Sequence, residues 1–168
     1  MRILGIDPGL NTTGYALLDA TSSAPQVVEA GVLRTSKGRQ TPDMAIRLKT
    51  LYDGLMELMQ QYTPNVMAVE QLYAHYDHPR TSILMAHARG VIFLAGGQQG
   101  ISVASYAATQ IKKIITGNGR ASKEQMQYTM LRELKLKQLP EPNDVADALA
   151  IALCHHYHSH RTAELESA

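Results

Sequence analysis

Four acidic residues that border apolar segments are the strongest chemical feature of this sequence. Asp7 and Glu70 each close a short apolar run, while Asp144 and Asp147 open an apolar segment near the C-terminus. Carboxylate oxygens are the ligands that hard cations such as Mg²⁺ and Mn²⁺ prefer, and four carboxylates would balance two divalent ions. If the chain brings these acids together, the sequence predicts a metal-dependent site.

The spacing of the last two acids supports this interpretation. Asp144 and Asp147 are three residues apart, so on a helix their side chains point to nearly the same side, about 60° apart. Asp147 is also the only charged residue between Val145 and Cys154. An unpaired carboxylate on so apolar a helix costs several kcal/mol of desolvation, and we therefore expect a cation or backbone donors beside it.

Each acid also has an ordinary structural explanation. Asn143 or Asp144 could cap a helix, where the dipole favours an acid in the first turn. Asp7 could form an Asx turn with Gly9, and Glu70 could be the solvent-facing end of a strand. Acids at the ends of two apolar strands and on one helix face nevertheless favour a common site.

The elements that would position these acids follow from the apolar periodicity. Three strands with short links come first and favour an antiparallel meander, and a helix then crosses back to the strand that ends at Glu70. Ser122 with Gln125 three residues later forms a capping box for a further helix. The predicted strands are residues 2–7, 13–18, 26–33, 66–70 and 101–104, and the other predicted helices are 42–62, 82–96, 107–115 and a last one ending near Tyr157.

Length and composition predict one globular domain over residues 1–157 and a polar, flexible C-terminal tail over 158–168. The chain has 168 residues, of which 45% are hydrophobic and 18% charged, enough for a proper core. Its single cysteine, Cys154, favours a reducing compartment, and we expect neither a signal peptide nor a membrane span. Four histidines are interpreted as a frayed helix end rather than a metal cluster: His155, His156, His158 and His160.

Basic residues gather in one part of the chain. The whole sequence has a net charge of +1, but between Ser105 and Lys137 seven basic residues stand against two acidic ones, a net of 7 − 2 = +5. This imbalance predicts a basic surface that faces an acidic site. The seven residues are Lys112, Lys113, Arg120, Lys123, Arg132, Lys135 and Lys137.

Six groups of short motifs, spread over nearly the whole chain, form a highly specific combination. They are residues 3–9 with 13–15, 70–73, 88–90, 106–108, 117–119 with 121 and 123, and 144–150. Together they resemble the RuvC family of Holliday-junction resolvases. The resemblance implies an α/β, ribonuclease-H-like fold with a five-stranded mixed sheet, three antiparallel strands then two parallel, and helices on both faces. It further implies a homodimeric endonuclease that nicks two opposing strands of a four-way DNA junction.

By motif position, Asp7, Glu70, Asp144 and Asp147 take the role of the family's metal-binding catalytic acids. The mechanism we expect is phosphodiester hydrolysis with two Mg²⁺ ions per site, for which Mn²⁺ would substitute. Asp7 is the expected bridge between the ions because it projects from the centre of the sheet. Some family members have His at the position of Asp144, so we expect a carboxylate to be required less strictly at this position than at the other three.

The resemblance also implies which residues contact DNA. Tyr73 falls where the family usually has a Phe that wedges or stacks at the junction, and a Tyr ring can do the same. Lys112 and Lys123 fall on the family's basic DNA-contacting positions, and Arg120 is a further basic candidate in the same segment. Residues 74–87 depart from the family pattern, because they are one residue longer and lack its Lys-Asn and Gly-Gln elements.

Partners and rival functions complete the expectations. The resemblance implies a branch-migration motor of the RuvA and RuvB type, action in the bacterial cytoplasm at the nucleoid, and no membrane. Actin-like ATPases and sugar kinases also begin with a strand ending in Asp-x-Gly, but 168 residues do not supply their two domains. A nuclease that processes structured RNA and a non-catalytic junction-binding scaffold remain as alternatives.

Overall fold

The computed structural model describes residues 1–21, 24–36, 42–72 and 79–166. The strands are β1 (Arg2–Asp7), β2 (Thr12–Asp19), β3 (Gln26–Arg34), β4 (Val66–Glu70) and β5 (Ser102–Tyr106). The helices are α1 (Met44–Tyr62), α2 (Pro79–Gln98), α3 (Ala108–Thr116), α4 (Lys123–Glu133) and α5 (Asn143–Glu166). Within those four ranges, no helix combines the length and the apolar character needed to cross a bilayer.

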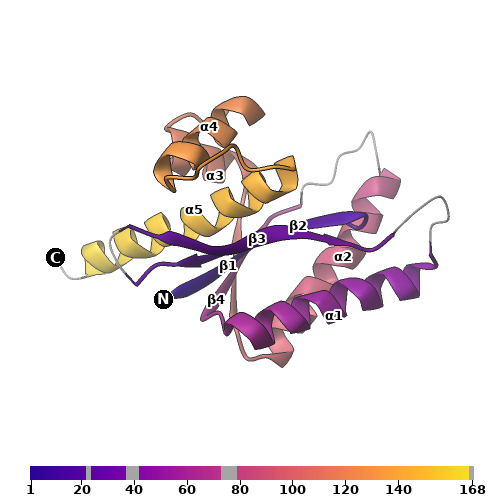
Figure 1. Cartoon of the computed structure of the whole chain (residues 1–168). Coiled ribbons are helices and arrows are strands. Elements are labelled where there is room, and N and C mark those ends of the chain that lie inside the picture. The colour runs from indigo at the N-terminus through magenta and orange to yellow at the C-terminus, as the bar shows by residue number, and fades with distance from the viewer. Residues whose placement is uncertain (22–23, 37–41, 73–78, 167–168) are drawn as a thin grey trace.

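The five strands form one mixed sheet in the order β3-β2-β1-β4-β5. The first three strands pair antiparallel, whereas β4 pairs parallel with both β1 and β5. Helix α5 covers one face of this sheet, and α1 and α2 cover the other (Figure 1). The predicted arrangement of three antiparallel strands, two parallel strands and helices on both faces is confirmed.

Alternation along the strands divides the core between the two faces. In β1, Leu4 and Ile6 are fully buried against α1 and α2, while Ile3 is buried in the cluster that contains α5. Because successive strand residues point to opposite faces, odd-numbered residues of β1 face α5. Asp7, the last residue of this strand, therefore faces the same helix.

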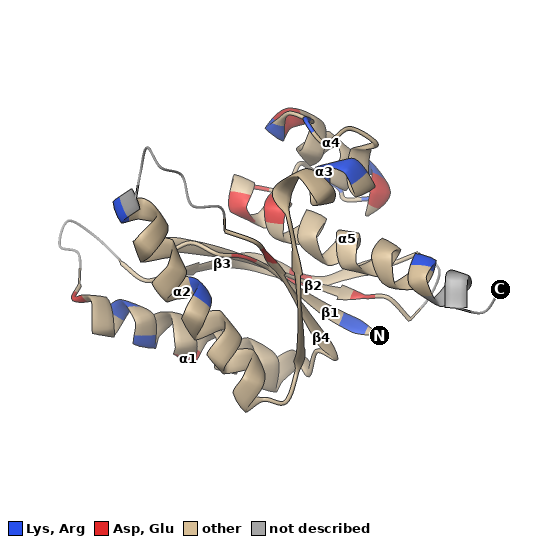
Figure 2. Ribbon diagram, turned by 180° about the vertical axis from the view of Figure 1, so that it is seen from behind, with Lys and Arg blue, Asp and Glu red and all other residues tan. Residues whose placement is uncertain are grey.

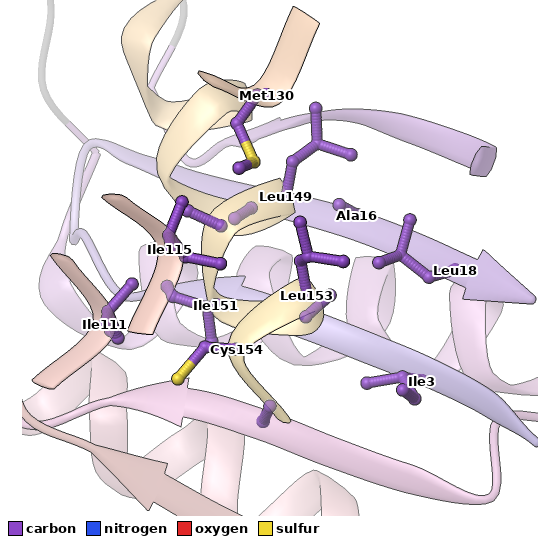
Figure 3. Packing of buried hydrophobic residues seen from close by; sticks show 14 of the residues in the cluster. Ile3, Ala16, Leu18, Ile111, Ile115, Met130, Leu149, Ile151, Leu153 and Cys154 are labelled. Atoms are coloured by element: carbon purple, nitrogen blue, oxygen red, sulfur yellow. The ribbon is translucent and has the colours of Figure 1, made fainter. Parts of the chain in front are cut away.

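Helices α3 and α4 form a further layer on α5. Ile111 and Ile115 of α3 lie beside Ile151 of α5, and Met130 of α4 packs near Leu149 (Figure 3). All five side chains belong to one buried cluster. The apolar contacts place the basic segment identified in the sequence directly above α5.

Two glycines let α5 lie unusually close to the sheet. A Cβ atom at Gly5 of β1 would lie 2.3 Å from the carbonyl oxygen of Ala148, and one at Gly14 of β2 would lie 2.1 Å from that of Asp144. Both distances are far shorter than any contact that a real Cβ makes. The backbone of α5 thus rests directly on the backbone of β1 and β2.

The C-terminal part of the chain differs from the prediction. Helix α5 continues to Glu166 rather than ending near Tyr157, so the predicted tail is helical over residues 158–166. His156 is only 3% exposed, and Nδ1 of His155 lies 2.7 Å from the hydroxyl oxygen of Tyr106. The interpretation of the histidines as a frayed helix end is therefore wrong, because contacts with β5 and the core hold this part of the helix.

We expect Gly5→Ala to destabilise the protein, because the new methyl group can be accommodated only if α5 moves away from β1. Overpacking of this kind typically costs about 1–3 kcal/mol, or roughly 2–10 °C in Tm for a chain of this size. Thermal unfolding measures the loss. Gly97→Ala on α2 is the control, since a Cβ there meets nothing within 4 Å and Ala is the better helix former. A Gly5→Ala protein as stable as wild type would contradict the close packing of α5.

Candidate active site

Asp7 and Glu70 lie next to each other at the same end of the sheet. They are the last residues of β1 and β4, two parallel strands whose register pairs Ile6 with Val69. The next residue along each strand is the acid, so the two carboxylates leave neighbouring strands on the same face. That face is the one covered by α5.

The first turns of α5 bring the other two acids to the same place. Gly14 pairs with Asp7 in the sheet, and the position of its missing Cβ lies 3.1 Å from Cβ of Asp144. Asp144 is therefore seated over the end of β1. Asp147, about one helical turn further on, lines a cavity together with Glu70. The structure thus brings all four predicted acids together.

Asp7 is the electrostatic centre of this group. Its pKa is raised from 3.8 to about 8, mainly by burial and then by the negative charges of Asp147, Glu70 and Asp144, in that order of importance. The positive charge of Lys123 acts in the opposite direction. The protein thus favours a protonated Asp7 at neutral pH when no cation is present.

Glu70 and Asp147 are perturbed in the same direction. Burial is the main cause of the raised pKa of each, and the charge of Asp147 raises that of Glu70 further. Lys112 lowers the pKa of both carboxyl groups, and Lys123 lowers that of Asp147. Acids with raised pKa values around one point create a strong field for a cation.

A cavity of about 180 Å³ opens between these acids and the helices above them. Lys112 of α3 and Lys123 of α4 line it opposite Glu70 and Asp147, so the predicted basic surface does face the acidic group. Figure 2 shows the acidic start of α5 beside the basic residues of the α3 and α4 layer. The remaining lining residues are Ala108, Ile111, Met126, Ala150 and Ile151.

Arg47 of α1 is a buried cation that the sequence analysis missed. It is 7% exposed, and its guanidinium donates hydrogen bonds to Oδ1 of Asn11 and, at 3.4 Å, to Oγ1 of Thr35. Arg47 and Asn11 line a second cavity, of about 390 Å³, that also reaches Asp144 and Thr81. The acids are therefore flanked by cavities on two sides, each with a cationic side chain in its wall.

Asp144 does lie in the first turn of α5, where the helix dipole favours an acid, but the other ordinary explanations receive little support. The side-chain oxygen of Asn143 accepts a hydrogen bond from Gln127 of α4 at 2.9 Å, so it is used to join two helices. The amide of Gly9, which an Asx turn of Asp7 would engage, instead faces Oγ1 of Thr13 at 3.4 Å. Glu70 lies in the wall of a cavity rather than on an open surface.

Arg120, one of the predicted DNA-contacting residues, lies apart from the cavities beside the acids. Arg120 is exposed in the loop between α3 and α4, where its backbone amide bonds Oδ1 of Asn118 at 3.0 Å, and it lines neither cavity beside the acids. Tyr73 lies outside the described residues, as does most of the first half of the segment that departs from the family pattern. A role in DNA binding stays a prediction for both.

The donor chemistry of the site fits a hard divalent cation. Its four acids supply only oxygen ligands, and burial together with their mutual repulsion raises the pKa of Asp7, an effect that a bound cation would oppose. Across the described ranges, no three Asp, Glu, His or Cys side chains already surround a single ion position. Like charges repel one another, so we expect the carboxylates to close around the ion only when it binds.

Comparison with known proteins identifies the same architecture. A family model described as crossover junction endodeoxyribonuclease RuvC matches residues 3–155. The crossover junction endodeoxyribonuclease RuvC of Rhodopirellula baltica is 50% identical over 155 residues, covering 92% of this chain and 85% of that protein. The protein of the same name from Desulforamulus reducens is 43% identical over 157 residues, covering 92% of this chain and 93% of that protein.

A solved structure agrees with these sequence relationships. Thermus thermophilus RuvC in complex with a Holliday junction substrate superposes with a TM-score of 0.88 at 26% sequence identity, covering 96% of each chain. This likeness extends over nearly the whole chain. It confirms the ribonuclease-H-like fold that the motifs implied.

We expect Asp7→Asn to stabilise the metal-free protein, and the gain to grow with pH. The folded pKa of about 8 lies above the ordinary 3.8, so the contribution of Asp7 to the free energy of unfolding is greatest below pH 4 and falls as the pH rises toward 8. Asn is uncharged in both states and escapes this loss. Thermal unfolding in chelator should show a gain at pH 8 that exceeds the gain at pH 5 by about 2 kcal/mol or more. Glu57→Gln, an exposed acid on α1, is the control, and equal gains of Asp7→Asn at both pH values would contradict the raised pKa.

Proposed function

Because the chain belongs to the RuvC family of crossover junction endodeoxyribonucleases, we propose that it resolves Holliday junctions by paired, symmetric nicks in four-way DNA during recombination and repair. The observation that carries this proposal is the convergence of Asp7, Glu70, Asp144 and Asp147 at one end of the sheet, beside Lys112 and Lys123. A site that pairs oxygen ligands with cations suits the hydrolysis of a phosphodiester. The chemistry and the family assignment therefore agree.

We infer that the four acids hold two divalent ions, Mg²⁺ with Mn²⁺ as a substitute. Four carboxylates would balance the charge of two such ions, and oxygen ligands suit both metals. When bound, the ions would activate the attacking water and stabilise the leaving 3′ oxygen. Asp7 must release its proton before it can act as a ligand, since its pKa in the metal-free protein is about 8.

The lysines on the far wall of the cavity would orient the scissile phosphate. Lys112 and Lys123 face Glu70 and Asp147 across a space of about 180 Å³. Their ammonium groups can hold phosphate oxygens while the acids face the reacting phosphorus. Contacts of this kind neutralise the negative charge that the acids alone would repel.

We propose that α2 forms a homodimer interface, which symmetric nicking requires. Ile83 and Leu94 are 58% and 55% exposed, and eleven residues on a helix bring them within about 20° of one another. The exposed residues His87 and Gly90 lie between them on the same face. A Cβ at Gly90 would meet nothing within 4 Å, so another helix could approach closely there.

Leu94→Glu should convert the dimer to monomers without unfolding the chain. The substitution places a charge in the proposed interface but leaves the buried face of α2 intact, and we expect dimer affinity to fall by at least about tenfold. Light scattering coupled to gel filtration measures the mass. Ile46→Glu on α1, which is 54% exposed, is the matched control and should remain dimeric. A monomeric wild type or a dimeric Leu94→Glu protein would remove α2 from the interface.

Asp7→Asn should abolish Mg²⁺-dependent cleavage while leaving junction binding intact. We expect the cleavage rate to fall by at least about 100-fold, because the variant loses a central metal ligand, whereas affinity for the DNA backbone comes mainly from basic residues. Gel assays on a labelled mobile junction, with and without Mg²⁺, measure both properties. Glu57→Gln should cut normally. Cleavage at the wild-type rate would overturn the assignment of Asp7.

The same assay separates the rival functions. Wild-type protein that binds junctions but never nicks them in Mg²⁺ or Mn²⁺ would be a scaffold, and preferential cleavage of structured RNA would indicate an RNA-processing nuclease.

Family membership is also the support for the two remaining expectations: a branch-migration motor as partner, and action on chromosomal DNA in the cytoplasm.

A further inference from the structure

A further cavity, of about 410 Å³, lies between α3 and the second half of α5. Its lining has three basic side chains, those of Lys113, His158 and Arg161, and all three are exposed. Ile114 and Tyr157 complete the lining. Three nitrogen donors around one hollow are suited to an anionic group.

The acid beside this cavity is already engaged. Glu133 of α4 accepts a hydrogen bond from the hydroxyl of Tyr157 at 3.0 Å and forms an ion pair with Arg132 at 3.5 Å. Tyr157 thus lines the cavity, but its hydroxyl proton is donated to Glu133 and is not available to a ligand. Over the part of the chain that the structure describes, Lys113 and Arg161 form no ion pair, which leaves their charges available to a ligand.

This basic cavity, formed by Lys113, His158 and Arg161, lies on the same side of α5 as the acids. Eleven residues separate Asp147 from His158, and fourteen separate it from Arg161, so both lie within about 40° of Asp147 around the helix. At 1.5 Å per residue, they are about 16 and 21 Å further along. Helix α3 contributes to both sites, with Lys112 lining the acidic cavity and Lys113 the basic one.

We propose that the basic cavity binds a backbone phosphate of the same DNA strand that is cut, on the order of five nucleotides from the scissile bond. Phosphates of one strand advance about 3.4 Å along the duplex axis per nucleotide, which sets this number for a separation of 16 to 21 Å. The inference rests on the proposed junction-cleaving function and adds a DNA contact to it. It assigns roles to Lys113, His158 and Arg161 that lie beyond the cleavage site.

The three donors would position DNA without reading its sequence. The planar guanidinium of Arg161 can hold two phosphate oxygens, while Lys113 contributes a point charge and His158 an additional donor. Phosphate contacts fix register and orientation but carry no base information. Loss of this cavity should therefore weaken binding of the junction arm and leave the preferred cleavage sequence unchanged.

The first test measures junction affinity and its salt dependence for Lys113→Gln and Arg161→Gln, in Ca²⁺ so that the DNA stays intact. Each variant should bind about fivefold more weakly, and the slope of log K against log salt should fall by about 0.9. Lys49→Gln is the matched control, because it removes one exposed positive charge from α1 on the other face of the sheet. It should bind like wild type.

The second test locates the phosphate. Neutral methylphosphonate linkages are placed one at a time, three to eight nucleotides either side of the cut, symmetrically in both cut strands. One position should weaken wild-type binding at least threefold and weaken binding by Arg161→Gln clearly less, because one partner of that phosphate is already missing in this variant. Lys49→Gln should respond like wild type.

The outcomes separate this inference from the proposed function. If wild type binds and cuts junctions but Arg161→Gln responds to every neutral linkage as wild type does, the basic cavity contacts no DNA phosphate and the inference is wrong. Unchanged affinity and salt slope in both Lys113→Gln and Arg161→Gln would overturn it too. That result would favour an acidic protein, rather than DNA, as the ligand of the basic cavity. If wild type neither binds nor cuts junctions, the proposed function itself fails.

Discussion

The direct contact between the backbone of α5 and the first two strands is the constraint on which the site depends. A side chain at Gly5 or Gly14 would collide with the helix. Because glycine has none, the backbone of α5 packs directly against the backbone of β1 and β2. Asp7 ends β1 two residues after Gly5 and pairs with Gly14. Any side chain at either glycine would lift the helix and separate Asp144 and Asp147 from the acids of the sheet.

The same contact produces the electrostatic strain of the site. Packing α5 so closely excludes water from the carboxyl groups and brings like charges together, and both effects raise the pKa of Asp7. Apolar packing by α3 and α4 must offset this cost in the metal-free protein. A bound divalent cation would neutralise the carboxylates and relieve this electrostatic cost. The free energy released by that relief would add to the affinity for the ion.

Sequence patterns could predict what depends on local periodicity. Short apolar runs that close on Asp7 and Glu70 indicated two strand ends, and the spacing of Asp144 and Asp147 indicated one helix face. The full length of α5 was missed because its support comes from Tyr106, far away in sequence. Arg47 was overlooked although it lies between Met44 and Leu51, inside the buried stripe of α1, where a charged residue needs a partner. Its partners are contributed by other segments, which no local pattern reveals.

The placement of the cations shows how one surface can attract both metal and DNA. Lys112 and Lys123 lie close enough to lower the pKa of Asp147, yet, for the described side chains, neither forms an ion pair with the acids. A direct pair would neutralise the carboxylates and compete with a metal ion, whereas lysines across a cavity remain available to phosphate oxygens. Because consecutive helical residues differ by about 100°, α3 can present Lys112 to the acids and Lys113 to the other flank. One short helix thereby supplies charge to two places along a single strand of DNA.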